Sequence, residues 1–132
     1  MKSFLSLGTN LGNREEYLEL ARNYLHNPPI TKLVHSSQII NTPAMDFLDQ
    51  PDFLNQVLEI ETELAPLDLL DFTQSIEQKI GRVKRFDKGP REIDIDILLY
   101  EGIERMVNDR LILPHHSIES RPFIGELLES IY

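Results

Sequence analysis

Two aspartates, Asp94 and Asp96, lie two residues apart in the run Ile93-Asp94-Ile95-Asp96-Ile97. The alternation of apolar and acidic residues predicts a strand with one apolar face, on which both carboxylates point the same way. Carboxylates so close repel each other unless a cation lies beside them, and hard divalent ions such as Mg²⁺ take oxygen ligands of this kind. An amphipathic strand with a solvated polar face explains the alternation equally well, so the strand alone leaves both interpretations open.

A basic segment precedes this strand and favours the first interpretation. Residues 82–91 hold one acidic residue, Asp87, and five basic residues, Arg82, Lys84, Arg85, Lys88 and Arg91. The segment therefore carries a net charge of +4 in a chain whose net charge is −9. Cations for phosphoryl oxygens beside carboxylates for Mg²⁺ indicate a polyphosphate substrate and phosphoryl transfer.

The composition of the whole chain narrows the class of protein. Residues 1–132 predict a single domain, with 41% hydrophobic and 27% charged residues and no cysteine. Thirteen Lys and Arg against 22 Asp and Glu argue against nucleic-acid binding. Neither a signal peptide nor a stretch of transmembrane length is found, so we expect a cytoplasmic protein without membrane contact.

The elements expected around the aspartate strand suggest an α+β fold. We expect strands over 3–7, 33–40, 53–62 and 93–100. Helices are expected from the capping signal at Asn13 and Glu16 to Asn27, over 66–80, and from a start between 117 and 122. This order predicts a ferredoxin-like βαββαβ core, an antiparallel sheet with helices on one face, plus a C-terminal helix. Many unrelated functions use that fold, so it identifies no chemistry.

Other patterns carry weaker signals. The glycines in Gly8-Thr9-Asn10-Leu11-Gly12 indicate a turn rather than a phosphate-binding loop, because no Gly-Lys-Ser/Thr follows. Gln74 and Glu77 share a helical face that reads as solvated. His115 and His116 are a weak metal signal, and for one of them a hydrogen bond to phosphate or a surface role is equally open. The first helix is expected to bury Tyr17, Leu18, Ala21, Tyr24 and Leu25.

The motif Gly89-Pro90-Arg91-x-x-Asp94-x-Asp96 resembles that of the 6-hydroxymethyl-7,8-dihydropterin pyrophosphokinases of folate biosynthesis. The resemblance spans nearly the whole chain. The segments that also match, in order, are 8–12, Thr42-Pro43, 50–55, Gly81-Arg82-Val83, Arg110-Leu111 and Pro114-His115.

The resemblance implies transfer of pyrophosphate from ATP to the hydroxymethyl group of the reduced pterin, leaving AMP. It implies that Asp94 and Asp96 hold two Mg²⁺ ions and that Arg82 and Arg91 are catalytic and contact the triphosphate. The positions that match the family's ATP site are Gln74, Glu77, Lys84, Ile97, Arg110, His115, His116 and Arg121. The positions that match its pterin site are Thr42, Pro43, Met45, Phe53, Asn55 and Phe123.

Within the pterin site, Phe53 and Phe123 would stack on the two sides of the flat ring, and Asn55 offers both a donor and an acceptor to its edge. Without the resemblance, both phenylalanines would be assigned to the core. The expected partners are small molecules, ATP and the reduced pterin, and the protein is expected to act as a monomer.

The chain departs from the family's usual residues at four positions, Lys84, Lys88, Ile112 and His116. Three other functions remain open. Another Mg²⁺-dependent transferase would use the aspartates without the aromatic site, and a non-catalytic ferredoxin-like module would bind ligand without turnover. The third is a degenerate family member that has kept the fold but has lost catalytic rate.

Overall fold

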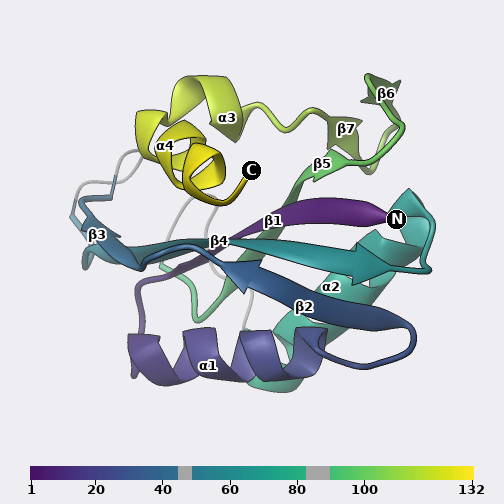
Figure 1. The fold of residues 1–132 in the computed structure, drawn as a ribbon. Helices are drawn as coiled ribbons and strands as arrows, with labels where there is room; N and C mark the ends of the chain where they lie inside the picture. Colours follow the sequence, from purple (N-terminus) through teal and green to yellow (C-terminus); the bar gives the residue numbers. More distant parts are fainter. Residues whose placement is uncertain (45–48, 83–89) are drawn as a thin grey trace.

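The computed structural model describes residues 1–44, 49–82 and 90–132. These form an α+β fold (Figure 1). Its elements are β1 Lys2–Thr9, α1 Arg14–Leu25, β2 Thr31–Ser36, β3 Ile40–Thr42, β4 Phe53–Thr62, α2 Pro66–Ile80, β5 Asp94–Tyr100, β6 Met106–Val107, β7 Ile112–Leu113, α3 Ser117–Ser120 and α4 Pro122–Ile131.

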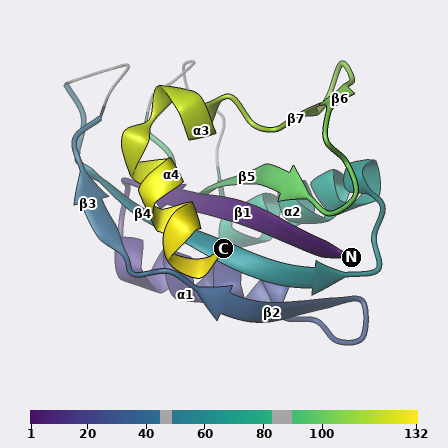
Figure 2. The same cartoon turned by 45° about the horizontal axis from the view of Figure 1, so that its top comes forward.

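An antiparallel sheet with the strand order β2-β4-β1-β5 forms the centre of the molecule. β3 extends it by pairing with the start of β4, and β6 and β7 form a separate two-stranded ribbon. Figure 1 and Figure 2 show α1 and α2 on one face of the sheet and α3 and α4 on the other. The predicted α+β class, antiparallel sheet and C-terminal helix are confirmed.

The helix ends agree with their sequence signals. The Asn13 side chain accepts a hydrogen bond from the Glu16 N–H at 3.2 Å at the start of α1. α2 begins at Pro66 and ends at Gly81, whose φ of 106° is the left-handed conformation that favours glycine at a helix end. The predicted 66–80 helix is therefore confirmed at both ends.

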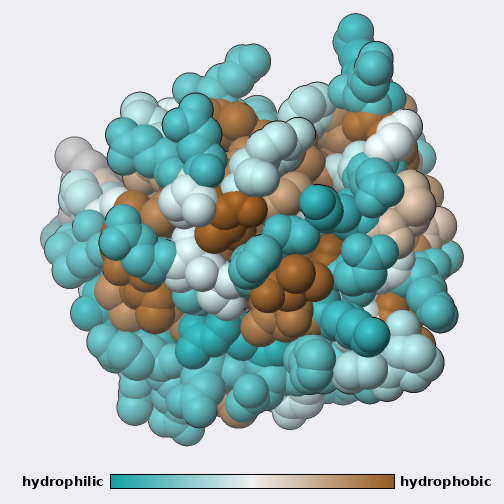
Figure 3. Space-filling model, viewed as in Figure 1, coloured by the Kyte–Doolittle hydropathy of each residue, from teal (hydrophilic) through white to brown (hydrophobic). Residues whose placement is uncertain are grey.

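Two hydrophobic clusters cover the two faces of the sheet. One lies under α1 and α2 and the other under α4, where Phe4, Val57 and Leu98 meet Ile124 and Leu127. Removing these side chains from water is the main force that holds the layers together, at about 1.5–3 kcal/mol for each large side chain. In Figure 3, teal areas separate the brown ones on the outer face that is shown.

The apolar face expected for α1 is only partly buried. Leu18, Ala21 and Leu25 are buried, whereas Tyr24 is 39% exposed and Tyr17 is half-buried. The Lys79 ammonium of α2 lies 5.7 Å from the centre of the Tyr24 ring. Tyr24 thus lies at the rim of the α1–α2 contact, where an aromatic ring can meet a cation.

The strand predicted over 33–40 is wrong as one continuous element. β2 ends at Ser36 and β3 begins at Ile40. Ser37 explains the break, because its hydroxyl accepts the Val57 N–H at 2.9 Å and its own N–H donates to the Val57 carbonyl at 2.8 Å. Gln56 also donates to the Ser37 carbonyl. A buried polar side chain here replaces part of the ladder between strands, an option that alternation of residues does not reveal.

The C-terminal region also differs in detail from the expectation. α3 and α4 both begin within the predicted interval, but the buried residues of α4 are Ile124, Leu127 and Leu128. Phe123 and Ile131 are partly buried against the same cluster. Within the described ranges, none of the helices combines the length and the apolar character needed to cross a bilayer.

Candidate active site

The two aspartates lie at the start of β5, on the face of the sheet that also carries α3 and α4. Asp94 pairs with Gly8 and Asp96 with Ser6 on β1. Their side chains are 26% and 29% exposed, whereas Ile95 between them is buried in the opposite cluster. The sequence prediction that both carboxylates share a face is therefore confirmed.

Arg82 joins the aspartates to α2. One of its guanidinium nitrogens, Nη1, lies 2.8 Å from Glu77 Oε2 and 3.1 Å from Asp94 Oδ1. The same Glu77 oxygen accepts the Ile95 N–H at 2.9 Å. Glu77 therefore extends from α2 to the edge strand β5, and its hydrogen bond holds the backbone between the two aspartates.

Glu77 and Asp96 are carboxyl groups with perturbed acidity. Burial raises the pKa of Glu77 to about 7, although the bonds from Ile95 and Arg82 act in the opposite direction. Burial also raises the pKa of Asp96 above its usual range, and the negative charges of Asp94 and Glu77 add to this effect. The positive charges of Arg121 and Arg91 offset only part of the repulsion among these carboxylates. An additional cation beside Asp96 would therefore be bound favourably.

The donor set suits Mg²⁺ more than a metal that requires a complete protein cage. Across residues 1–44, 49–82 and 90–132, no three His, Asp or Glu side chains converge on one point. Asp94 and Asp96 would therefore provide two carboxylate ligands and leave the other positions to water and phosphate, the usual coordination of Mg²⁺.

Arg91 connects the aspartates to the aromatic part of the site. Its Nε lies 3.8 Å from Asp94 Oδ2, and its guanidinium carbon lies 4.9 Å from the centre of the Phe53 ring. A guanidinium over an aromatic face is attracted by the negative face of the ring. One side chain thus contacts both a proposed metal ligand and a proposed pterin-binding residue.

The residues expected around the pterin come from neighbouring elements. Asn55 is buried in β4, and its Nδ2 donates to Thr42 Oγ1 of β3 at 2.7 Å. Asn55 Oδ1 and Phe53 Cδ1 each lie 3.7 Å from the position of a Cβ on Gly8, so the amide and the ring flank the same point of β1. Phe123 lies at the start of α4, which packs on β4. Pro43 is exposed, and Met45 lies outside the described residues.

His115 lies beside Asp96, with its Nε2 3.7 Å from Asp96 Oδ1. Its backbone N–H donates to the Leu98 carbonyl, and its ring stacks on that of His116 with centres 4.5 Å apart. Burial lowers the pKa of His115 to about 4, and the neighbouring His116 adds to the effect. His115 is therefore a neutral side chain at physiological pH.

The remaining residues that match the ATP site are Gln74, Arg110, Ile97, Arg121 and Lys84. The Arg110 guanidinium contacts Asp71 and lies 3.5 Å from Gln74 Oε1, so α2 and the segment between β6 and β7 meet there. Ile97, by contrast, is 1% exposed and packs in the cluster beneath α1 and α2, so its side chain faces away from the aspartates. Arg121 is close enough to influence Asp96 and His115, and Lys84 lies outside the described residues.

Asn10 is a residue of the site region that the sequence interpretation missed. It is 1% exposed, and its Nδ2 donates to Gln50 Oε1 and the Pro51 carbonyl at 2.8 and 3.1 Å. Its Oδ1 accepts the Arg91 N–H at 2.9 Å. A polar residue between two glycines after an apolar strand was the available signal, but the pattern equally describes a simple turn.

Comparison with known proteins identifies the family. Residues 4–132 match the family model described as 7,8-dihydro-6-hydroxymethylpterin-pyrophosphokinase. The 2-amino-4-hydroxy-6-hydroxymethyldihydropteridine pyrophosphokinases of Bacillus subtilis and Haemophilus influenzae are 38% and 41% identical over 92% of the chain. The chain spans 72% and 76% of their lengths. The folic acid synthesis protein fol1 of Schizosaccharomyces pombe is 40% identical over 92% of the chain, which spans 16% of that protein.

The match to the family model covers nearly all of the chain, and the aspartate pair, both arginines and the aromatic positions lie within the matched range. The chain therefore belongs to the 7,8-dihydro-6-hydroxymethylpterin-pyrophosphokinase family of enzymes.

Proposed function

We propose that this protein transfers pyrophosphate from ATP to the hydroxymethyl group of 6-hydroxymethyl-7,8-dihydropterin in folate biosynthesis. The products are AMP and the pterin diphosphate. Within this family, the observation that carries the proposal is the arrangement of Arg82 and Arg91 on either side of the Asp94 carboxylate. Two cations beside a carboxylate pair suit a substrate that brings phosphate and metal together.

The metal ligands in this proposal are Asp94 and Asp96, and they would hold two Mg²⁺ ions. When bound, the ions supply Lewis-acid activation of the attacking hydroxyl and neutralisation of phosphate charge. The raised pKa of Asp96 supports this role, because a cation relieves the repulsion that disfavours its ionised form. Donors from two carboxylates, water and phosphate are the coordination that Mg²⁺ prefers.

The arginines act on the triphosphate. Arg82 is shared between Glu77 and Asp94 and can turn one of its donors to a phosphoryl oxygen while another stays on Glu77. Arg91 packs over Phe53, which directs its guanidinium along the boundary between the phosphate and pterin sites. Both would stabilise the charge that develops at the β-phosphorus during in-line attack of the pterin hydroxyl.

For the pterin, we propose Thr42, Pro43, Met45, Phe53, Asn55 and Phe123. Asn55 supports this assignment because Thr42 holds its amide group in one orientation, which leaves the carbonyl oxygen directed to the same side as Phe53. A planar heterocycle between Phe53 and Phe123 would gain stacking on both faces. The buried amide would select a ring whose edge offers matching hydrogen bonds.

For ATP, we propose Gln74, Glu77, Lys84, Ile97, Arg110, His115, His116 and Arg121. Arg110 and Gln74 lie together on the outer side of α2, and His115 lies next to Asp96, which suits the two ends of a nucleotide. Ile97 can contribute only its backbone, and Glu77 acts through Arg82 and β5. The nucleotide contacts of these two residues are therefore indirect or limited to the main chain.

We propose the finer features of the fold as well. The order β2-β4-β1-β5, with α1 and α2 on one face, is consistent with a ferredoxin-like core in which β3 extends β4. A single pyrophosphokinase domain over residues 1–132 is supported by the extent of the family match. We further propose that the enzyme acts as a monomer in the cytoplasm on its two small-molecule substrates.

The test is AMP release from ATP and Mg²⁺, measured with and without 6-hydroxymethyl-7,8-dihydropterin. We expect AMP only when the pterin is present, and none after EDTA is added. ADP in place of AMP would contradict transfer of pyrophosphate, and no product from a folded sample would contradict the activity. Turnover of another acceptor in preference to the pterin would favour a different Mg²⁺-dependent transferase.

A further inference from the structure

Gly8 lies between the two halves of the candidate site. It pairs with Asn55 of β4 on one side and with Asp94 of β5 on the other. Residues directly opposite each other in an antiparallel sheet point to the same face, so Gly8 belongs to the face that carries both of these side chains. Two strand spacings, about 10 Å, separate the backbones of its two partners. The backbone of Gly8 therefore forms the floor between the proposed pterin and metal sites.

The side chains of β1 on this face become smaller toward the site. Phe4 packs in the cluster under α4, and Ser6 is buried next to it. Gly8 has no side chain and is half-buried, although Leu7 and Thr9 on either side of it are buried. Solvent thus reaches the sheet at Gly8.

The fold itself does not require a glycine at this position. The φ angle of Gly8 is not positive, in contrast to that of Gly12. A Cβ on Gly8 would lie 3.7 Å from Asn55 Oδ1 and 3.7 Å from Phe53 Cδ1, which is ordinary van der Waals contact. Alanine would therefore fit the free protein, and within a strand it is the more stable residue because glycine loses more conformational freedom on folding.

The space left by the missing side chain lies toward Asp94. The two described atoms within 4 Å of the Cβ position, on Asn55 and Phe53, both come from β4, and no atom of β5 is that close. Asn55 and Phe53 belong to the proposed pterin site, and Asp94 is a proposed metal ligand. The space over Gly8 therefore connects the place of the ring with the place of the metal and phosphate.

We propose that Gly8 is a specificity-determining residue, and that the space over it admits the short arm carrying the acceptor's hydroxyl group from the ring site to the metal site. This inference rests on the proposed function and adds which acceptors fit. A planar heterocycle with a one-carbon arm can stack between Phe53 and Phe123 and extend its hydroxyl toward Asp94 across Gly8.

A purely structural role makes a different prediction. If Gly8 serves only the packing of β1, Gly8→Ala changes the stability of the fold and affects all ligands of the site alike. If Gly8 keeps space for the arm, the variant folds as well as the wild type and loses affinity only for a ligand that has the arm.

The experiment compares two ligands by titration calorimetry in the presence of a non-hydrolysable MgATP analogue. One is 6-hydroxymethyl-7,8-dihydropterin, and the other is 7,8-dihydropterin, which has the same ring without the arm. We expect Gly8→Ala to weaken binding of the first roughly ten- to hundredfold, the effect of a methyl group forced into filled space, and of the second much less. The MgATP analogue alone should bind as it does to the wild type.

Gly125→Ala is the matched control. It adds the same methyl group to a glycine of α4, where the Cβ would lie 3.8 Å from the Ile118 carbonyl oxygen. We expect it to leave both pterin affinities and kcat unchanged. In urea, the unfolding midpoints of both alanine variants should equal or exceed that of the wild type.

An unchanged affinity of Gly8→Ala for the hydroxymethyl pterin would overturn the inference, and so would a lowered urea midpoint. Equal weakening of both pterins would also overturn it, because the methyl group would then meet the ring rather than the arm. AMP formation tests the proposed function separately. A wild type that forms no AMP but shows the arm-dependent loss in Gly8→Ala would contradict the activity and leave the role of Gly8 in force.

Discussion

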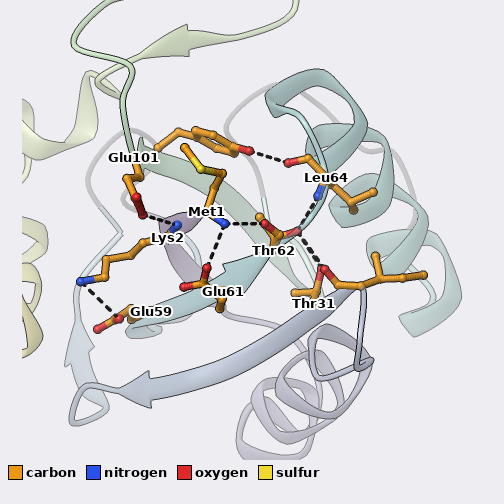
Figure 4. Close-up of polar contacts among 10 residues, drawn as sticks. Met1, Lys2, Thr31, Glu59, Glu61, Thr62, Leu64 and Glu101 are labelled. Atoms are coloured by element: carbon orange, nitrogen blue, oxygen red, sulfur yellow. Dashed lines mark hydrogen bonds and ion pairs between the residues drawn. The ribbon is translucent and has the colours of Figure 1, made fainter.

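The two ends of the central sheet differ in how their charged groups are paired. At one end, where β1 begins and β4 ends, the polar groups drawn in Figure 4 have partners within the chain. The amino group of Met1 contacts Glu61 Oε1 at 2.9 Å and the Thr62 carbonyl at 2.8 Å. The Lys2 N–H donates to Glu101, and the Thr31 and Thr62 hydroxyls bond to each other at 2.9 Å. These groups are paired with one another without a ligand.

At the opposite end, where β5 begins, β5 and α2 bring like charges together. The negative charge of Asp94 adds to the raised pKa of both Asp96 and Glu77, and Arg82 is divided between Glu77 and Asp94. Thr9 Oγ1 is buried there without a hydrogen-bond partner among the described residues. Repulsion and incomplete pairing cost stability in the free protein, and a bound cation and phosphate would relieve them. The contrast between the two ends supports the proposed site at the start of β5.

The largest expected effect comes from removing one of the aspartates. Asp96→Ala or Asp94→Ala should lower AMP formation by at least about a thousandfold, because bound metal contributes several kcal/mol of transition-state stabilisation. Folding should remain intact, since the change also removes repulsion. The measurements are kcat for AMP formation and the free energy of unfolding in urea.

The matched control lies at the other end of the sheet. Glu61→Ala breaks an ion pair whose partners are both about half exposed, so it should change stability by less than about 1 kcal/mol and leave kcat unchanged. If the Glu61 and Asp96 variants lost activity equally, the contrast between the two ends would be wrong.

A smaller loss is expected from Glu77→Gln. The substitution keeps the shape and an acceptor for the Ile95 N–H but removes the charge that holds Arg82, which we expect to lower kcat roughly tenfold. The loss should disappear in an Arg82→Ala background, because both changes act through the same contact. Gln78→Ala, on the exposed side of the same helix, should leave kcat as in the wild type. Additive losses would mean that Glu77 acts independently of Arg82.

Phe123→Ala distinguishes the pterin site from the phosphate site. Loss of one stacking face should weaken pterin binding about tenfold and leave MgATP affinity nearly unchanged. Isothermal titration with each ligand separately provides the two affinities. Equal weakening of both would argue that Phe123 supports the packing of α4 rather than the pterin ring.

The smallest effect is a pH dependence of the metal-free protein. The folded state raises the pKa values of Asp96 and Glu77, so it binds protons more tightly than the unfolded state. Their favourable contribution is therefore complete below the ordinary carboxyl pKa and is lost as pH rises through the raised values, about 7 for Glu77.

In urea unfolding with EDTA, the wild type should lose stability relative to Asp96→Asn as the pH rises from 5 to 8. Mg²⁺ should then stabilise the wild type more at pH 8 than at pH 5, because the ion binds the ionised carboxylates. A difference between wild type and Asp96→Asn that does not change with pH would show that Asp96 has an ordinary acidity in the fold.

Local sequence signals predicted the parts of the fold that local forces determine. The bounds of β4 and α2 follow from alternation, from Pro66 and from Gly81. The break after Ser36 and the burial of Glu77 could not be predicted, because both depend on partners distant in sequence, Val57 and Ile95. Glu77 even reads as a solvated residue until the edge of β5 is known to lie beside it.

In the candidate site, too, local spacing predicted some features and contacts between residues distant in sequence determine the others. The shared face of Asp94 and Asp96 follows from spacing alone, whereas the contacts of Arg82, the stacking of Arg91 on Phe53 and the orientation of His115 need the fold. The resemblance to a family selected the aromatic positions, which composition assigned to the core. It did not indicate that the Ile97 side chain faces away from the site.

The bond from Glu77 to the Ile95 N–H has a consequence for how the enzyme tolerates change. It ties the helix that fills the core beneath the sheet to the backbone that spaces the metal ligands on the other face. The hydrophobic packing of Leu69 and Ile76 would therefore influence the affinity of the proposed Mg²⁺ site. A substitution that only loosens α2 would weaken binding at the proposed Mg²⁺ site well before the protein unfolds.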